Sequence, residues 1–233
     1  MNAVAPSTRK LIKLAENALQ KQRNQEAYQL YQQVLMLNPH HGEALFKLGW
    51  IMHSAGQYDA ATLLYERSLQ ENPKHFESYK MLCEVYASRN QNEQAVRLAE
   101  QSTVQMPQDP KTYGLVATML TRFNNVHVVP TYLERVLPQF PADATLHQLY
   151  CIALKACNRF EEAEEAYRKL TARLRVDPVI RITFETMLSR VNLSNEQIER
   201  ERKRFIESVE KFTKEKPRVL AESLANMRLF ALA

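Results

Sequence analysis

The sequence is poor in glycine and cysteine and has no long apolar run. Four glycines among 233 residues exclude a collagen-like or glycine-rich low-complexity chain. No stretch of about 18 apolar residues occurs, which is the length that a membrane-spanning helix needs. Residues 1–10 also lack the apolar core of a signal peptide. We therefore expect a cytoplasmic protein without membrane contact.

The formal net charge of +5 is spread along the chain and is not gathered in one basic stretch. With 45% hydrophobic and 24% charged residues, the chain has enough apolar side chains to fold around a core, unlike a disordered segment. The absence of a basic face argues against nucleic-acid binding. No nucleic-acid partner is expected.

A spacing of 34 residues recurs without a gap through five copies. One position of each copy holds a small residue or cysteine: Ala15, Gly49, Cys83, Ala117 and Cys151. A second position holds Ala27, Ala61, Ala95, Val129 and Ala163, and prolines recur at Pro39, Pro73, Pro107 and Pro141. Several positions in one phase indicate an internal repeat.

Each copy can be explained as two antiparallel helices joined by a turn. In the second copy, Gly49 is expected to contact Ala61, where small residues let two helices approach closely, and Tyr65 fills the space beside them. Pro73 ends the second helix because proline lacks an amide hydrogen and clashes with the preceding turn. One such hairpin cannot bury its apolar faces alone, so neighbouring copies must stack.

This pattern resembles the tetratricopeptide repeat (TPR) family, whose members are protein-binding scaffolds. The resemblance implies an all-α fold, a right-handed TPR superhelix (α-solenoid) of about five helix-turn-helix repeats with C-terminal capping helices. The expected segments are a leader at 1–7, repeats at 8–41, 42–75, 76–109, 110–143 and 144–177, a capping helix at 178–193, an amphipathic helix at 194–216 and a helical segment at 217–233.

The turns inside the repeats differ in residue type. The first repeat has the polar turn Gln22-Arg23-Asn24, the third has Asn90, where a left-handed backbone is tolerated, and the fourth has Asn124-Asn125. Pro130 falls early in the second helix of the fourth repeat. We therefore expect that helix to be shortened or kinked.

Residues 177–233 resemble the linker between the TPR array and the catalytic region of bacterial SPINDLY-like and O-GlcNAc-transferase-like glycosyltransferases. The resemblance rests on Asp177-Pro178, on the helix end Met187-Leu188-Ser189-Arg190, on the segment 193–205 and on the apolar run 229–233. It implies the N-terminal, substrate-recruiting portion of a larger enzyme, whose catalytic residues have no counterpart here. The apolar run also predicts a core shared with further residues, or weak self-association through the C-terminal helices.

No arrangement of side chains predicts catalysis, a cofactor or a metal, and the chain is not expected to be an enzyme on its own. His41 and His75 occupy equivalent inter-repeat loops, but no third or fourth ligand lies near them, so they are interpreted as solvated turn residues. Cys83 and Cys151 are expected to be buried thiols at packing positions, and Cys157 stands alone at a helix end.

The expected functional surface is the concave groove lined by the first helix of each repeat, where a protein or peptide partner would bind. The predicted groove residues are Glu43, Phe46, Trp50, His53, Glu77, Lys80, Glu84, Lys111, Thr118 and Arg122. Trp50, the single tryptophan, is the expected anchor, because an exposed indole beside Phe46 would hold an apolar partner side chain. Packing of Trp50 against the neighbouring repeat is the alternative.

Overall fold

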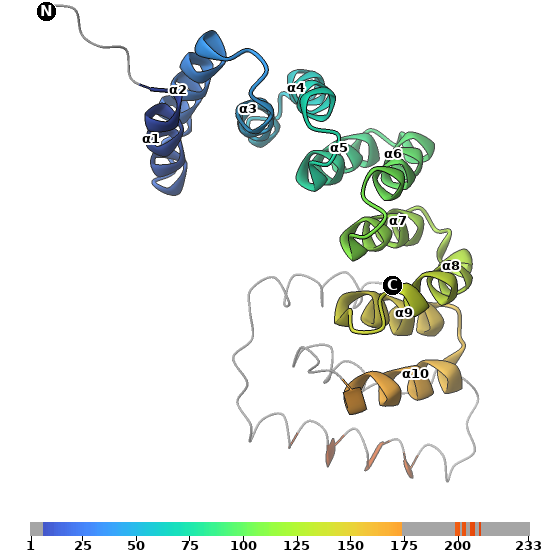
Figure 1. Cartoon of the computed structure of the whole chain (residues 1–233). Coiled ribbons are helices and arrows are strands. Elements are labelled where there is room, and N and C mark those ends of the chain that lie inside the picture. The colour runs from blue at the N-terminus through green and yellow to red at the C-terminus, as the bar shows by residue number, and fades with distance from the viewer. Residues whose placement is uncertain (1–6, 174–198, 201, 204–205, 208–209, 211–233) are drawn as a thin grey trace, which may run out of the picture. The chain divides into compact units, whose positions relative to one another are not determined.

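The computed structural model describes residues 7–173 and, beyond them, residues 199–200, 202–203, 206–207 and 210. In this part of the chain there are ten α-helices and two short 3₁₀ helices and no β-strand, which confirms the all-α, solenoid-type fold (Figure 1). The predicted segments 178–193, 194–216 and 217–233 lie outside the described residues, apart from the few just named. The chain divides into two compact units, residues 1–119 and 120–233.

The first unit is a row of helical hairpins. Its helices are α1 (Thr8–Gln20), α2 (Asn24–Leu37), α3 (Gly42–Ser54), α4 (Tyr58–Glu71), α5 (Phe76–Ser88), α6 (Asn92–Gln105) and most of α7 (Pro110–Arg122). Helix α1 packs on α2, α3 on α4 and α5 on α6, while α2 also contacts α3 and α4 also contacts α5. Neighbouring hairpins therefore pack on one another, as expected for repeats that cannot bury their apolar faces alone.

That core is built from the recurring small and apolar positions. One cluster joins Leu11 and Ala15 of α1, Tyr31 of α2, and Leu48 and Ile51 of α3. All five side chains are at most 6% exposed. Because three successive helices contribute to a single cluster, the first hairpin depends on α3 for part of its burial.

The second unit contains the irregular second half of the fourth repeat. Its elements are η1 (Val126–Val128), α8 (Val129–Val136), η2 (Leu137–Gln139), α9 (Ala144–Ala156) and α10 (Phe160–Arg173). Helix α8 has 8 residues, with Pro130 in its first turn and a 3₁₀ turn on each side. The predicted shortening is confirmed, because proline fits only where no intrahelical N–H is needed.

The turns inside the hairpins share one backbone feature. A residue with positive φ, between 59° and 75°, occurs every 34 positions: Gln22, Gly56, Asn90, Asn124 and Asn158. This left-handed conformation reverses the chain after the first helix, and asparagine or glycine adopts it at the lowest cost. The turns expected at Asn90 and Asn124 are confirmed. Gln22 takes the same conformation, although glutamine is not suited to positive φ.

Gly49 lies directly against the side chain of Tyr65. A Cβ added to Gly49 would lie 2.7 Å from Cε1 of Tyr65 and 3.3 Å from Cβ of Leu64. The closest approach to Gly49 across the α3–α4 hairpin is therefore made by the Tyr65 ring, and the expected contact with Ala61 stays a prediction. The missing side chain makes room for an aromatic ring that is 0% exposed.

Candidate partner-binding face

The predicted groove residues of the first unit lie on its odd-numbered helices. We define the helix-A face by the following residues: Glu43, Lys47 and Trp50 of α3, Glu77, Lys80 and Glu84 of α5, and Lys111 and Thr118 of α7. Residues three, four or seven positions apart share one side of a helix, so each helix contributes a single stripe. Arg122, in the last turn of α7, belongs to the second unit and is not counted in this face.

Trp50 is partly covered and partly exposed. Its side chain is 39% exposed, on a helix where Leu45, Leu48 and Ile51 are almost completely buried. An indole held on one side and open on the other loses little conformational freedom when a partner covers it. The exposure expected of Trp50 is therefore present, and its packing against the neighbouring repeat stays an untested alternative.

Phe46 is not available to a partner, contrary to expectation. Its side chain is 7% exposed, and its ring lies 5.8 Å from the ring of Tyr65 and 4.8 Å from that of His75. Because α5 begins beside Phe46, the next hairpin covers this side of α3 one turn before Trp50. Phe46 thus holds α3, α4 and the start of α5 together and does not line an open groove.

His75 is a helix cap and not a solvated turn residue. The backbone N–H of Ser78 donates to Nδ1 of His75 at 3.2 Å, and Nε2 of His75 lies 3.2 Å from Oε2 of Glu43. An accepting Nδ1 requires the tautomer protonated on Nε2, which then donates to Glu43. The cap therefore links the first turn of α5 to the first turn of α3.

His41 has the same capping role one repeat earlier. The backbone N–H of Ala44 donates to Nδ1 of His41 at 3.2 Å, and the half-buried His41 precedes α3 as His75 precedes α5. In the second unit, Asp143 accepts from the N–H of Leu146 at 2.8 Å. The inter-repeat loops thus end in side chains that satisfy an otherwise unpaired helix N–H.

Glu43 is bound on both sides. Oε1 of Glu43 lies 3.3 Å from Nζ of Lys47, in addition to the contact with His75. The hydrogen bond with His75, supported by Lys47, holds the pKa of the Glu43 carboxyl below its ordinary value, while partial burial opposes the shift. The carboxylate therefore stays ionised and fixed in orientation at the edge of the helix-A face.

A buried hydroxyl pair continues this network into the hairpin core. Oγ of Ser78 donates to Oγ of Ser68 at 3.0 Å, and Oγ of Ser68 donates to the carbonyl oxygen of Gly42 at 2.9 Å. Both serines are 0% exposed. Together with His75 and Glu43 they connect α3, α4 and α5, so the position of α5 relative to α3 is set by directional bonds as well as by apolar packing.

His53 lies at the end of α3 and is half-buried. Its ring meets the rings of Tyr58 and Tyr65 edge-on, at 5.3 and 6.5 Å between centroids. The geometry is that of an aromatic cluster at the α3–α4 turn. His53 therefore supports the hairpin and offers only part of its ring to a partner.

Helix α5 supplies the most accessible charges of the helix-A face. Glu77 and Lys80 are exposed and have no ion pair or hydrogen bond with the described residues, whereas Glu84 is half-buried. On α7, Nζ of Lys111 lies 5.9 Å from the centre of the Phe76 ring, and Oγ1 of Thr118 donates to the carbonyl oxygen of Gly114 at 2.7 Å. The face therefore presents both signs of charge around Trp50.

The described residues include no group of three or more histidine, cysteine, aspartate or glutamate side chains that could hold a metal ion. Across the same ranges, no helix is both long and apolar enough to span a bilayer. The thiols of Cys83 and Cys151 are buried as predicted, and burial raises the pKa of each to about 12. Such thiols are poor nucleophiles near neutral pH.

Comparison with known proteins supports the TPR resemblance. Residues 18–62 and 52–119 match the model of the family described as Tetratricopeptide repeat. No curated protein sequence matches the chain. The family match therefore covers nearly all of the described part of the first unit.

Solved structures show the same fold at low sequence identity. PilF of Pseudomonas aeruginosa has a TM-score of 0.62 at 10% identity, covering 95% of this chain and 96% of that one. MamA of Desulfovibrio magneticus RS-1 has a TM-score of 0.56 at 16% identity, with 73% and 96% covered. YrrB, described as a TPR protein with an unusual peptide-binding site, has a TM-score of 0.50 at 16% identity, with 70% and 84% covered. These likenesses concern the fold, and none bears on the glycosyltransferase resemblance of residues 177–233.

Proposed function

We propose, taking the tetratricopeptide-repeat scaffold as the premise, that this chain binds a partner protein or peptide on the helix-A face of its first unit and carries out no catalysis there. The observation that carries the proposal is the 39% exposed indole of Trp50, set among the charges of that face. Its chemistry is that of an interface anchor, because tryptophan dominates binding energy more often than most residue types.

The surroundings of Trp50 support an orienting role for charge. Lys47 and Glu43 form an ion pair one to two turns before Trp50, and Glu77 and Lys80 on the next odd-numbered helix have open charges. Mixed charges of this kind direct the orientation of a partner more than they raise its affinity. The expected ligand therefore has one large apolar side chain flanked by charges of both signs.

The rigidity of α3 and α5 supports the same proposal. Glu43, His75, Ser78 and Ser68 link the two helices through hydrogen bonds of 2.9 to 3.2 Å. A binding surface that is already ordered loses less entropy when it is covered. The TPR protein YrrB, with its peptide-binding site, is a fold-level precedent for a peptide ligand.

Cross-linking of captured partners tests this placement. The full chain would be incubated with a lysate and a lysine-reactive cross-linker, and the linked positions mapped by mass spectrometry. We expect links to concentrate at Lys47, Lys80 and Lys111 of the helix-A face. Links that concentrate at Lys10 and Lys21 of the first hairpin, which contributes no residue to this face, would contradict the proposal.

The enzyme-associated alternative remains a prediction from sequence. It rests on the resemblance of residues 177–233 to a glycosyltransferase linker, and its test is the reading frame of the native gene after the codon for Ala233. A frame that runs into a nucleotide-sugar-binding domain would make the helix-A face a recruiter of acceptor proteins. The cytoplasmic location, the absence of a nucleic-acid partner and weak self-association likewise remain predictions.

A further inference from the structure

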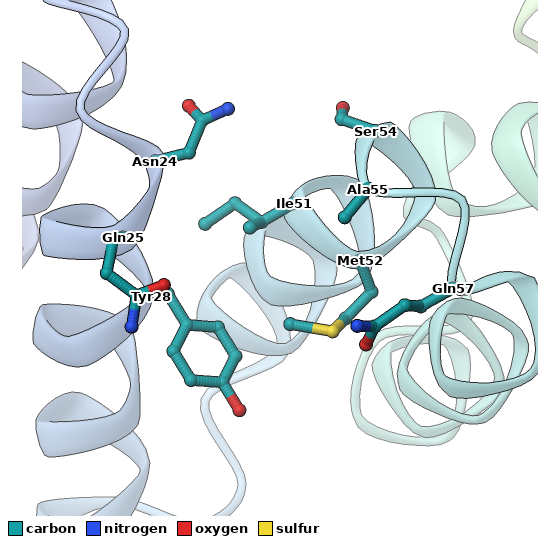
Figure 2. Close-up of a pocket in the computed structure, with 8 residues that line it drawn as sticks. All are labelled: Asn24, Gln25, Tyr28, Ile51, Met52, Ser54, Ala55 and Gln57. Carbon is teal, nitrogen blue, oxygen red and sulfur yellow. The ribbon is translucent and has the colours of Figure 1, made fainter.

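A hollow lies beside the end of α3, close to the helix-A face, since its lining residue Ser54 donates from Oγ to the carbonyl oxygen of Trp50 at 2.9 Å. It is a pocket of about 370 Å³ between the start of α2 and the end of α3, which we call the first slot. Its lining residues are Asn24, Gln25, Tyr28, Ile51, Met52, Ser54, Ala55 and Gln57. Figure 2 shows Ile51 and Met52 extending from α3 toward α2, with Tyr28 on the opposite wall.

The lining is neutral and rich in amides. None of the eight lining residues is charged, in a chain of which 24% is charged. The buried Ile51 and half-buried Met52 form an apolar floor, while the amides of Asn24, Gln25 and Gln57 are exposed at the rim and make no side-chain hydrogen bond to the described residues. Each such amide can donate and accept at once.

The equivalent position one repeat later is bridged by a side-chain pair. Arg89 stands 34 residues after Ala55, and Asp59 stands 34 residues after Gln25. A guanidinium nitrogen of Arg89 lies 2.6 Å from a carboxylate oxygen of Asp59, so the pair spans from the end of α5 to the start of α4. In the first slot, alanine and glutamine replace both partners and leave this space open.

The backbone does not explain the difference between the two slots. Ala55 directly follows α3 with φ −87° and ψ 5°, and Arg89 directly follows α5 with φ −98° and ψ 8°. Both positions therefore direct a side chain in nearly the same way. The first slot is open because of side-chain identity, and substitution alone can close it.

We propose that the first slot binds a short neutral segment of a partner protein, with one apolar side chain over Ile51 and Met52 and its peptide groups paired with the rim amides. A charged ligand group would lose its hydration with no opposite charge to compensate. A nucleic acid would find no cation for its phosphates. The volume lies at the low end for ligand pockets, about 300–1,000 Å³, which suits a single side chain with its flanking amides.

A blocked amino acid is the direct probe of this site. N-acetyl-L-leucine N′-methylamide has one apolar side chain and two peptide groups, and it would be titrated into the full chain with labelled isoleucine and methionine methyl groups. We expect saturable shifts of the Ile51 and Met52 signals, with a Kd on the order of millimolar for so small a ligand. Shifts that do not saturate would overturn the proposal.

The Arg89–Asp59 pair one repeat later suggests a variant in which the first slot is closed. Gln25→Asp with Ala55→Arg rebuilds the Arg89–Asp59 pair one repeat earlier, and both positions are exposed, so folding should be retained. We expect binding of the probe to weaken at least tenfold, and the single variant Ala55→Arg serves if the pair destabilises the chain. Equal binding by wild type and closed variants would overturn the proposal.

Two controls test the charge preference of the first slot and the location of the bound probe. The glutamate analogue of the probe should bind at least fivefold more weakly than the glutamine analogue, from which it differs by one negative charge, and equal affinity of the two would overturn the neutral-ligand assignment. Leu63→Ala, on α4 and outside both the first slot and the helix-A face, should leave the Ile51 and Met52 shifts unchanged. Loss of the shifts in Leu63→Ala would show that the probe is not bound in the first slot.

Discussion

Gly49 and Tyr65 meet so closely that no side chain fits between them: a Cβ at Gly49 would lie 2.7 Å from the tyrosine ring. The ring is 0% exposed and cannot move aside freely. We predict that Gly49→Ala destabilises the first unit, because overpacking costs about 1–3 kcal/mol and exceeds the gain in helix propensity of about 1 kcal/mol. Urea denaturation followed by circular dichroism measures the change.

Gly42→Ala is the control for that substitution. Gly42 is also in α3, but a Cβ there would have no neighbour closer than 3.6 Å. The variant should be neutral or stabilised by up to about 1 kcal/mol, the helix-propensity difference between the two residues. Similar losses at both glycines would show that the Tyr65 contact is not the cause.

The left-handed turn at Gln22 predicts a stabilising change. Gln22 has φ 59°, a conformation that costs an L-residue with a Cβ roughly 1–2 kcal/mol. Gln22→Gly should therefore raise stability by about 0.5–1 kcal/mol, after the greater entropy of glycine in the unfolded chain is counted. Gly56→Ala, at φ 75° with open space around it, should lower stability by about 1 kcal/mol. If both changes shift the urea midpoint in the same direction, backbone strain is not the determining effect.

The two capping histidines should respond oppositely to aspartate. His41→Asp provides a stronger N-cap with a negative charge at the helix start, which should stabilise by about 0.5–1 kcal/mol. His75→Asp removes the ring contact with Phe46 and brings a second carboxylate toward Glu43, so we expect a loss of about 1–2 kcal/mol. Thermal melts at neutral pH compare the two, and a gain in both variants would refute the role assigned to Glu43.

Glu43 should contribute to the pH dependence of stability. Its pKa is lowered in the folded chain, mainly by the hydrogen bond with His75, so its stabilising effect is complete above the ordinary carboxyl value of 4.5. That effect is lost as the pH falls through the lower, folded value. The urea midpoint should therefore fall less between pH 6 and pH 3 in Glu43→Gln than in wild type. If the urea midpoint falls equally in Glu43→Gln and in wild type, the contact of Glu43 with His75 does not persist in solution.

The repeat and its irregularity could be predicted from sequence because they depend on local rules. The small residues Ala15 and Gly49 recur in phase, asparagine marks the turns, and Pro130 can only be near a helix start. These features need no knowledge of which element packs on which. They were sufficient for the fold class and for the shortened α8.

The candidate site was only partly predictable, because burial depends on the neighbouring repeat. Phe46 and Trp50 are four residues apart on one side of α3, and nothing in their spacing shows that the start of α5 covers only Phe46. The capping by His75 depends on ring orientation, which a loop position does not specify. The first slot did have a signal in the sequence: Ala55 occupies the position that Arg89 takes one repeat later.

The central claim is that the helix-A face binds the partner through Trp50. Its most direct test is the affinity of a purified captured partner for wild type, Trp50→Ala and Leu63→Ala, measured by calorimetry. Leu63 is the matched control, since it is 63% exposed on α4, outside the helix-A face. We predict at least a tenfold loss of affinity for Trp50→Ala, as for an interface hot spot, and at most a twofold change for Leu63→Ala. Equal affinity of wild type and Trp50→Ala, with both chains folded, would contradict the account.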